Sequence, residues 1–135
     1  MTDNGGMNKA GERQRSIAAV MGAGHTLFSW TPLLFMVVFA IFTTAVAIDI
    51  GQLPSYGEPD PKNAGFEWLY NSALVTLVIA LYSLPFWAIT TLMGYVPGFG
   101  FRPRPRDIAA YVGGGLLIAL TLYGDPMGLG GWFFD

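Results

Sequence analysis

The residues from Trp68 to Val96 form an unbroken stretch that contains no Asp, Glu, Lys, Arg or His side chain. A helix of roughly 20 apolar residues is long enough to cross the ~30 Å hydrocarbon core of a bilayer. This stretch is longer than that, so it can cross with tilt or continue into the headgroup region. We therefore expect a membrane-spanning helix over about 68–96, and the rest of the chain must be compatible with one.

The composition agrees with a membrane environment. Charged residues make up 12% of the 135 residues, which is about half the usual share in soluble domains. Hydrophobic residues make up 53%. A soluble protein with so few charged residues would have too little polar surface to cover its fold. The net charge of −2 and the lack of a basic stripe argue against nucleic acid as a partner. The absence of cysteine excludes disulfides, thiolate metal sites and thiol catalysis.

Two further spans are expected. One runs over about 32–50, where no charge occurs before Asp49, and the other over about 108–123, ending before Asp125 and Pro126. The segment 51–67 is rich in Pro and Gly and reads as a loop. The predicted fold class is therefore an all-α integral membrane protein with three transmembrane helices, forming a single membrane domain over 16–135. A two-span alternative leaves the Gly-rich third segment outside the membrane.

The N-terminal part is expected to differ from the spans. Residues 1–15 are polar and have too few apolar side chains to offset the entropy of ordering, so we expect a mobile polar tail. Residues 16–29 have apolar side chains at helical spacing, which predicts an in-plane amphipathic helix capped by Ser16. The alternative is that this segment extends the first span and is broken from it at Pro32.

The basic residues predict the orientation. Six of the seven Lys and Arg residues fall in the N-terminal tail or in the loop after the second span. Because cytoplasmic loops carry an excess of basic residues, we expect the N-terminus in the cytoplasm and the C-terminus outside, in a bacterial inner membrane. Arg102, Arg104 and Arg106 are expected to determine topology or to contact lipid headgroups.

Small and aromatic residues indicate packing surfaces and anchors. Small or weakly polar residues recur at four-residue spacing in the second and third spans, which is typical of close helix contacts in membranes. Tryptophans near the ends of the predicted helices are typical of headgroup anchors. The predicted helix-packing residues are Ser72, Thr76, Ala80, Ala109, Gly113, Gly114, Gly115 and Ala119, and the predicted anchors are Trp30, Trp68 and Trp132.

Few residues suggest chemistry. His25 is the only histidine and a candidate ligand of a haem or chlorophyll-type pigment, although a lone histidine is more often hydrogen-bonded or solvated. The chain has no second histidine for a bis-histidine haem and no ligand set for zinc. Asp49 and Asp107 lie at span ends, where capping or solvation is expected, with Asp107 at an N-cap position. The sequence implies no cofactor beyond lipid, and any pigment or haem contact would come through a partner.

These observations predict a function without catalysis, because no nucleophile is paired with a base and no phosphate-binding loop is present. We expect a small accessory or structural subunit of a larger integral membrane complex, with energy-transducing complexes as one class of host. Its partners would be other integral membrane subunits. The alternative is a homo-oligomeric transporter or channel component, in which Pro85 and the glycines at 113–115 would break helices around a transport site.

Overall fold

The structure is a computed structural model that describes residues 5–55 and 59–134, with residues 5–10 described by their backbone alone. The described residues form an all-helical fold with no β-strand. The helices are α1 (Gly5–Ser29), α2 (Thr31–Ile50), α3 (Glu67–Gly94), α4 (Pro105–Leu122) and α5 (Leu129–Phe133). The three predicted spans thus correspond to α2, α3 and α4, with ends that differ by at most a few residues.

Local sequence explains where the helices begin and end. α2 and α4 each carry a proline in the first turn, where the missing N–H removes no intrahelical hydrogen bond. α2 ends at Gly51, whose φ of 75° lies in the left-handed region that favours glycine. α3 continues through Pro85 without interruption.

Two helices are long and apolar enough to cross a membrane: the nearly continuous Gly11–Ile50 helix and α3. Only 28% of the most apolar window of each is buried within the chain, whereas the core helix of a soluble protein would be mostly covered. At 1.5 Å per residue, the 40 residues of Gly11–Ile50 extend about 60 Å, roughly twice the ~30 Å thickness of a bilayer core. These helices support a membrane location.

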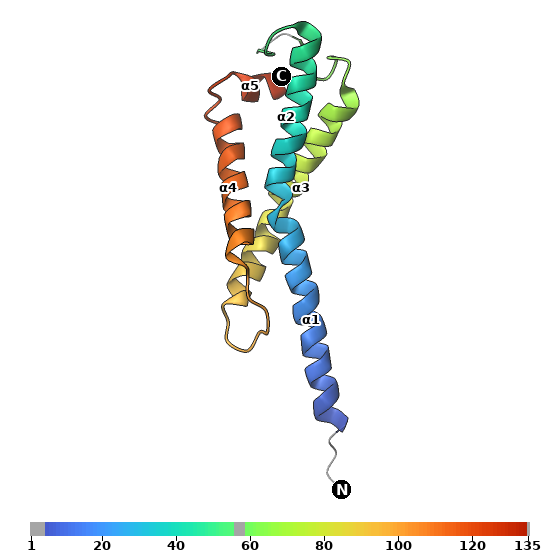
Figure 1. Cartoon of the computed structure of the whole chain (residues 1–135), viewed down its shortest axis with the longest axis vertical. Helices are drawn as coiled ribbons and strands as arrows, with labels where there is room; N and C mark the ends of the chain where they lie inside the picture. The colour runs from blue at the N-terminus through green and yellow to red at the C-terminus, as the bar shows by residue number, and fades with distance from the viewer. Residues whose placement is uncertain (1–4, 56–58, 135) are drawn as a thin grey trace.

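The helices form an elongated bundle (Figure 1). α2 packs against both α3 and α4, and α1 continues from the lower end of α2 and contacts α3 and α4 where they pass it. The N-terminal part of α1 projects beyond the other helices. α5 folds back over the opposite end of the bundle, next to α2, so the C-terminal residues lie far from α1.

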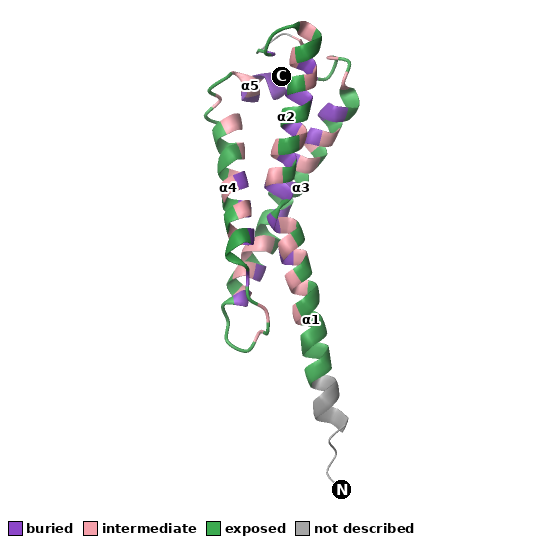
Figure 2. Ribbon diagram, viewed as in Figure 1, coloured by how far each residue is buried: buried purple, intermediate pink, exposed green. Residues whose placement is uncertain are grey.

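An aromatic core closes the upper end of the bundle. Phe42 of α2 stacks on Trp132 of α5 with ring centroids 5.3 Å apart, and Phe39 meets Phe133 edge-on at 5.1 Å. Each favourable aromatic pair adds about 0.5–1.5 kcal/mol to the stabilisation from burial alone. Buried positions of this core appear as separate purple segments on the helices at this end (Figure 2). The buried members of this core are Phe35, Phe39, Phe42, Val46, Leu69, Tyr70, Ala73, Leu77, Trp132 and Phe133.

The N-terminal region differs from the sequence expectation. α1 begins at Gly5 rather than Ser16, so Ser16 is not an N-cap and residues 5–15 are helical. No proline occurs before Pro32, and Pro32 occupies a first-turn position that helices tolerate, so nothing in the sequence forces a break at 16. α1 follows the direction of α2 (Figure 1), as in the alternative of an N-terminal extension, although the junction lies at Trp30. Residues 1–4 of the predicted tail lie outside the described residues, and its mobility stays a prediction.

Two further expectations are corrected. Asp107 is not the N-cap of α4, because the helix begins at Pro105 and Arg104 occupies the cap position without a side-chain hydrogen bond. Trp132 does not stand on the outer surface as an anchor. Its side chain is fully buried, stacks on Phe42 and donates a hydrogen bond from Nε1 to the carbonyl of Pro59 at 2.6 Å. The turn at Asp125, whose φ is +37°, returns the chain so that this side chain enters the core.

Candidate functional site at the crossing of α1, α3 and α4

Polar side chains gather where α1 passes into α2 and meets α3 and α4. On α3 and α4 they recur at four-residue spacing, so each of these helices contributes them from one face, and on α1 and α2 they lie close together near the junction of the two helices. Because these helix segments are otherwise apolar, the groups have mainly one another and nearby carbonyls as partners. We call this group the polar crossing; it comprises His25, Thr26, Ser29, Thr31, Ser83, Trp87, Thr91, Asp107 and Tyr111.

His25 is completely buried in the polar crossing. Its Nε2 lies 3.0 Å from Oγ1 of Thr91, and that hydroxyl donates its proton to the carbonyl of Trp87 at 2.7 Å. Since the Thr91 proton is already used, Oγ1 must accept from His25, which places the histidine proton on Nε2. Nδ1 is then a buried acceptor, and no described residue donates a hydrogen bond to it.

Aromatic rings enclose the histidine. Its ring is stacked with Trp87 at a centroid distance of 6.2 Å and tilted against Phe101 at 5.4 Å. A haem or pigment reaching Nδ1 would have to displace one of these rings, because the side chain has no exposed surface. His25 therefore lies at the centre of the candidate site, but as a residue packed among aromatic rings.

A second chain of contacts ties α3 to its neighbours. Nε1 of Trp87 donates to Oγ of Ser29 at 3.1 Å, and Ser29 donates to the carbonyl of His25 at 2.7 Å. The indole ring of Trp87 stacks on Tyr111 of α4 at 4.2 Å with an interplanar angle of 9°. One tryptophan thus connects α1, α3 and α4 through both its N–H and its ring face.

Three hydroxyl groups complete the crossing on the side of α2. Oγ of Ser83 lies 3.0 Å from Oγ1 of Thr31 and 3.2 Å from the hydroxyl of Tyr111. The Tyr111 hydroxyl also donates to the carbonyl of Ala80 at 3.1 Å. In an apolar surrounding, unpaired hydroxyl groups are costly, so this arrangement favours one relative position of the three helices.

Asp107 is the buried acid of the crossing, with a relative exposure of 1%. Oγ1 of Thr26 donates to its Oδ2 at 2.9 Å. Its Oδ1 lies 3.6 Å from Nε of Arg106, and it accepts no hydrogen bond from the described residues. Because the Arg106 side chain is 67% exposed, this ion pair is screened by solvent and only weakly offsets the cost of burying the carboxylate.

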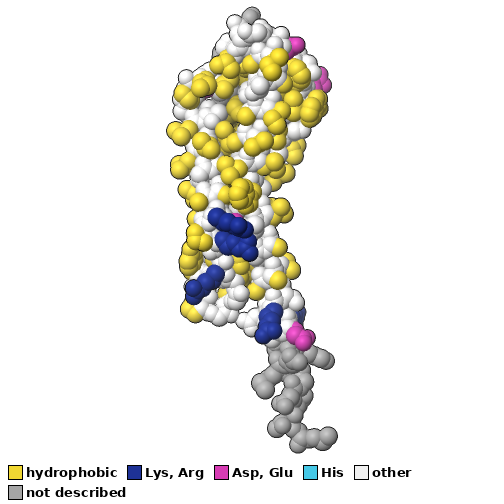
Figure 3. All heavy atoms as spheres, in the orientation of Figure 1, with side chains coloured by type: hydrophobic (Ala, Val, Ile, Leu, Met, Phe, Trp, Pro, Cys, Tyr) yellow, Lys and Arg dark blue, Asp and Glu magenta, His cyan; other side chains and the backbone are white. Residues whose placement is uncertain are grey.

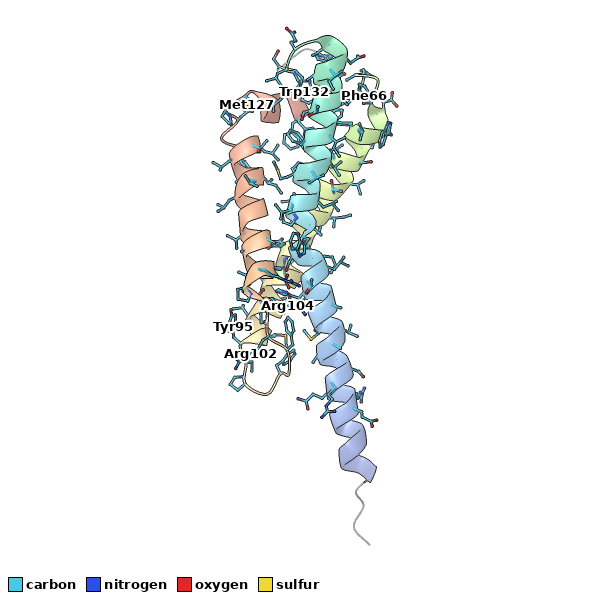
Figure 4. All side chains as sticks on the ribbon, viewed as in Figure 1. Phe66, Tyr95, Arg102, Arg104, Met127 and Trp132 are labelled. Atoms are coloured by element: carbon cyan, nitrogen blue, oxygen red, sulfur yellow. The ribbon has the colours of Figure 1, made fainter. Side chains whose placement is uncertain are left out.

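A hollow of about 490 Å³ opens beside Asp107 between α1 and the loop that precedes α4. Small side chains of α1 leave this space, including Ala19 and Ala23, and the side chains of Arg102 and Arg104 form its other wall. Figure 4 shows Arg104 beside α1 and Arg102 further along the loop. Arg106 does not line the hollow, and its guanidinium stands at the surface.

The predicted helix-packing residues behave in three different ways. Ser72 and Thr76 donate hydrogen bonds to carbonyls of their own helix, and Ala80 is buried. At Gly114 a Cβ atom would come within 2.8 Å of the Pro32 side chain and 3.0 Å of the Leu33 backbone nitrogen, so this glycine permits the close approach of α4 to α2. The remaining small residues of α4 lie on surfaces that the described chain does not cover: Ala109, Gly113, Gly115 and Ala119.

The remaining predicted anchors stand at the surface. Trp30 and Trp68 are 49% and 68% exposed, as an interfacial tryptophan would be. Trp30 lies at the junction between α1 and α2, and Trp68 lies in the first turn of α3. Their depth in a membrane stays a prediction.

The sequence alone indicated His25 and Asp107 but not the other members of the polar crossing. Thr91 and Trp87 contact His25, Thr26 binds Asp107, and Ser83 and Tyr111 bind each other. A signal was nevertheless present: Ser83–Trp87–Thr91 and Asp107–Tyr111 each repeat at four-residue spacing, which places polar atoms on one helix face.

Hydrogen bonds dominate the arrangement. Within residues 11–55 and 59–134, no group of three or more His, Cys, Asp or Glu side chains could hold a metal ion. Two buried side-chain atoms there accept no hydrogen bond, namely His25 Nδ1 and Asp107 Oδ1. Such a site suits a ligand that brings hydrogen-bond donors or positive charge.

Comparison with known protein families, curated proteins and solved structures finds no significant match for this chain. The class of protein is therefore defined by the structure: an all-helical chain with two helices long and apolar enough to cross a membrane. What it does within that class rests on its surfaces and its site.

Proposed function

We propose that the chain is a small accessory subunit of a larger integral membrane complex and acts by helix packing rather than chemistry. The observation that supports this most is the outward face of α4. Ala109 is exposed there, and a Cβ atom built on Gly113 or Gly115 would meet no other atom within 4 Å. By contrast, the neighbouring Gly114 is in contact with α2.

This contrast matters because glycine is costly in a helix. Each glycine destabilises a helix by about 1 kcal/mol relative to alanine. Gly114 has a reason within the chain, namely the close approach to Pro32 and Leu33. Gly113 and Gly115 have none among the described residues. They lie two positions apart, about 200° around the helix, so one partner helix does not cover both. A helix of another subunit, packed closely on the side of α4 that carries Ala109 and Gly113, would supply that reason for Gly113.

The large side chains beside these glycines support the same proposal. Val112, Leu116 and Leu120 are 47%, 60% and 62% exposed, so the face is apolar where it is not small. A partner helix would bury these side chains while its backbone approaches Gly113. The proposed partner is therefore another integral membrane subunit, and complexes that transduce energy remain one proposed class of host.

We further propose three spans, with the N-terminus in the cytoplasm of a bacterial cell and the C-terminus outside the inner membrane. Basic side chains gather towards the α1 end in Figure 3, and acidic ones are visible near the opposite end. The 20 residues of α2 correspond to about 30 Å, the thickness of a bilayer core. α4, with 18 residues, is slightly shorter and would cross with α2 and α3 as a packed bundle.

The same α4 face is also suited to a second copy of the chain, which is the homo-oligomeric transporter alternative. Broken helices would favour transport, but α3 continues through Pro85 and α4 through the glycines at 113–115. The accessory role is therefore favoured, because α4 has a docking face and neither α3 nor α4 has a break that would form a transport site.

Extraction of the tagged protein from native membranes in a gentle detergent tests this proposal. The expected result is a large particle containing defined partner subunits, identified by mass spectrometry and sized on the same peak. A lone monomer would contradict both roles. A small particle containing only this chain would replace the accessory role with the homo-oligomer, and flux through proteoliposomes would then test transport.

A further inference from the structure

The hollow beside Asp107 is lined by charges of both signs. Asp107 forms one wall and has an oxygen that accepts no hydrogen bond, and Arg102 and Arg104 form another wall. Asp107 is 1% exposed, so its free acceptor is a buried group rather than a surface charge. A ligand that satisfies this hollow must carry an anionic group for the arginines and a donor for the carboxylate.

A shallow, open apolar groove lies along α2, and side chains of that helix and its cap alone line it. One part, of about 570 Å³, is lined by residues from Trp30 to Ala40, and a second, of about 490 Å³, by residues from Val37 to Ile48. Val37 and Ala40 line both parts, so the groove is continuous along the helix. It is lined almost entirely by hydrocarbon side chains.

The hollow and the groove lie on the same face of the α1–α2 helix. Ala19, Ala23 and Thr26 line the hollow, and Trp30, Leu33 and Val37 line the beginning of the groove. These six residues follow one another at intervals of three or four, which keeps them on one helical face. At the junction the N–H of Trp30 donates to the carbonyl of Leu27, three residues back, at 3.4 Å, and the N–H of Leu34 donates to the carbonyl of Trp30 at 2.9 Å, so the two helices join through one tighter turn.

We propose that this face binds one phospholipid with a primary-amine headgroup, that is, a phosphatidylethanolamine. Its phosphate lies between Arg102 and Arg104, and its ammonium group donates to Oδ1 of Asp107. Its acyl chains follow α2 from Trp30 towards Ala40. That distance is ten residues, or about 15 Å, which equals half the thickness of a ~30 Å hydrocarbon core.

The headgroup chemistry selects this lipid over the alternatives. Arginine binds phosphate through paired N–H donors, so the two arginines hold any phospholipid. A quaternary choline headgroup has no N–H to donate, and a glycerol headgroup brings no positive charge to the buried carboxylate. Of the ethanolamine, choline and glycerol headgroups, ethanolamine alone both brings a positive charge to Asp107 and donates to the oxygen that lacks a hydrogen bond.

The first experiment changes only the lipid. Delipidated full-length protein in detergent is titrated with phosphatidylethanolamine, its N-methyl and N,N-dimethyl forms, phosphatidylcholine and phosphatidylglycerol, and bound lipid is counted by native mass spectrometry. A lost charge-assisted hydrogen bond is expected to weaken binding about tenfold between the ethanolamine and choline lipids, with the methylated forms in between. Equal affinity for these two lipids, or tighter binding of the glycerol lipid, would overturn the proposal.

The second experiment changes the protein. Asp107→Asn keeps an oxygen that accepts from Thr26, and it is expected to abolish the preference for ethanolamine over choline while leaving choline binding unchanged. The double variant Arg102→Gln/Arg104→Gln should weaken all phospholipids. Arg15→Gln, an exposed arginine on α1, is the control for loss of one charge and should change nothing. An Asp107→Asn protein that keeps the preference would also overturn the proposal, and if that variant does not fold, the methylation series still decides.

This inference does not depend on the docking face of α4. Lipid selectivity is measured on the isolated chain, whereas the accessory role is measured by the partners retained on extraction. Either result can fail while the other stands.

Discussion

The two ends of the bundle are stabilised by different interactions. At the α5 end, Phe42, Phe133 and Trp132 form an aromatic core in which Trp132 has its one polar atom paired with a carbonyl. At the α1 end, the helices cross through hydrogen bonds, and two buried polar atoms there accept no hydrogen bond from the described residues. The aromatic end therefore has its buried polar atom paired within the chain, whereas the polar crossing keeps two buried acceptors available to a ligand.

The largest expected effect comes from removing the centre of the aromatic core. Trp132→Ala is expected to lower the free energy of unfolding by about 3–5 kcal/mol, because it removes a fully buried ring and leaves a cavity. Thermal and denaturant unfolding followed by circular dichroism in micelles measures this. The neighbouring Phe134→Ala is the control: its side chain is 58% exposed and its loss should cost under about 0.5 kcal/mol. Equal effects of the two substitutions would show that α5 does not dock on the core.

In the polar crossing, a substitution that leaves a buried polar atom without a hydrogen bond should lower the free energy of unfolding more than one that removes the polar side chain. Thr91→Val removes the acceptor of His25 Nε2–H and leaves a second buried nitrogen unsatisfied, which is expected to cost about 1–3 kcal/mol. His25→Leu removes the unsatisfied Nδ1 together with the donor and should cost less than Thr91→Val. The same unfolding experiment ranks the two variants, and the reverse order would contradict the claim that an unpaired buried nitrogen costs more than the loss of the imidazole.

A smaller effect is expected from a single hydroxyl of the crossing. Tyr111→Phe keeps the ring stacked on Trp87 but removes the hydrogen bond to the Ala80 carbonyl, at a cost of about 1 kcal/mol. Tyr123→Phe, at a side chain that is 91% exposed, should leave stability unchanged. A difference in unfolding midpoint between the two variants is the readout, and its absence would mean that the hydroxyl contributes nothing to the crossing.

The smallest effect, of opposite sign, is expected at the outward glycine of α4. Gly113→Ala should stabilise the isolated chain by up to about 1 kcal/mol, because its Cβ meets no atom and alanine favours helix. Gly114→Ala at the next position should destabilise, since its Cβ would stand 2.8 Å from Pro32. Unfolding of the two variants side by side checks the opposite signs, and a destabilising Gly113→Ala would contradict the outward placement.

The sequence was sufficient to predict where most helices lie. Runs without charge predicted spans over 32–50, 68–96 and 108–123, close to α2, α3 and α4, because hydrophobicity and proline positions are local signals. The sequence did not predict where α1 begins. The polar composition of residues 1–15 predicted a mobile tail, but no proline interrupts a helix there.

What remained hidden depends on contacts between distant residues. The predicted anchor Trp132 enters the core only because the turn at Asp125 returns the chain, with the Asp125 carboxylate accepting from the N–H of Gly130 and Gly131. The pairing of Asp107 with Thr26 joins residues 81 positions apart, so no local pattern shows it. The four-residue repeat of Ser83, Trp87 and Thr91 was visible, and it would have indicated a polar face on α3.

The measurement that tests the proposed role most directly is partner retention by Gly113→Leu. The account predicts that this variant folds, because the side chain enters open space, but loses its partner subunits on extraction. Val75→Leu, which adds bulk to an exposed position of α3, is the matched control and should retain them. A Gly113→Leu protein that is folded and still carries every partner would contradict the claim that α4 is the docking face.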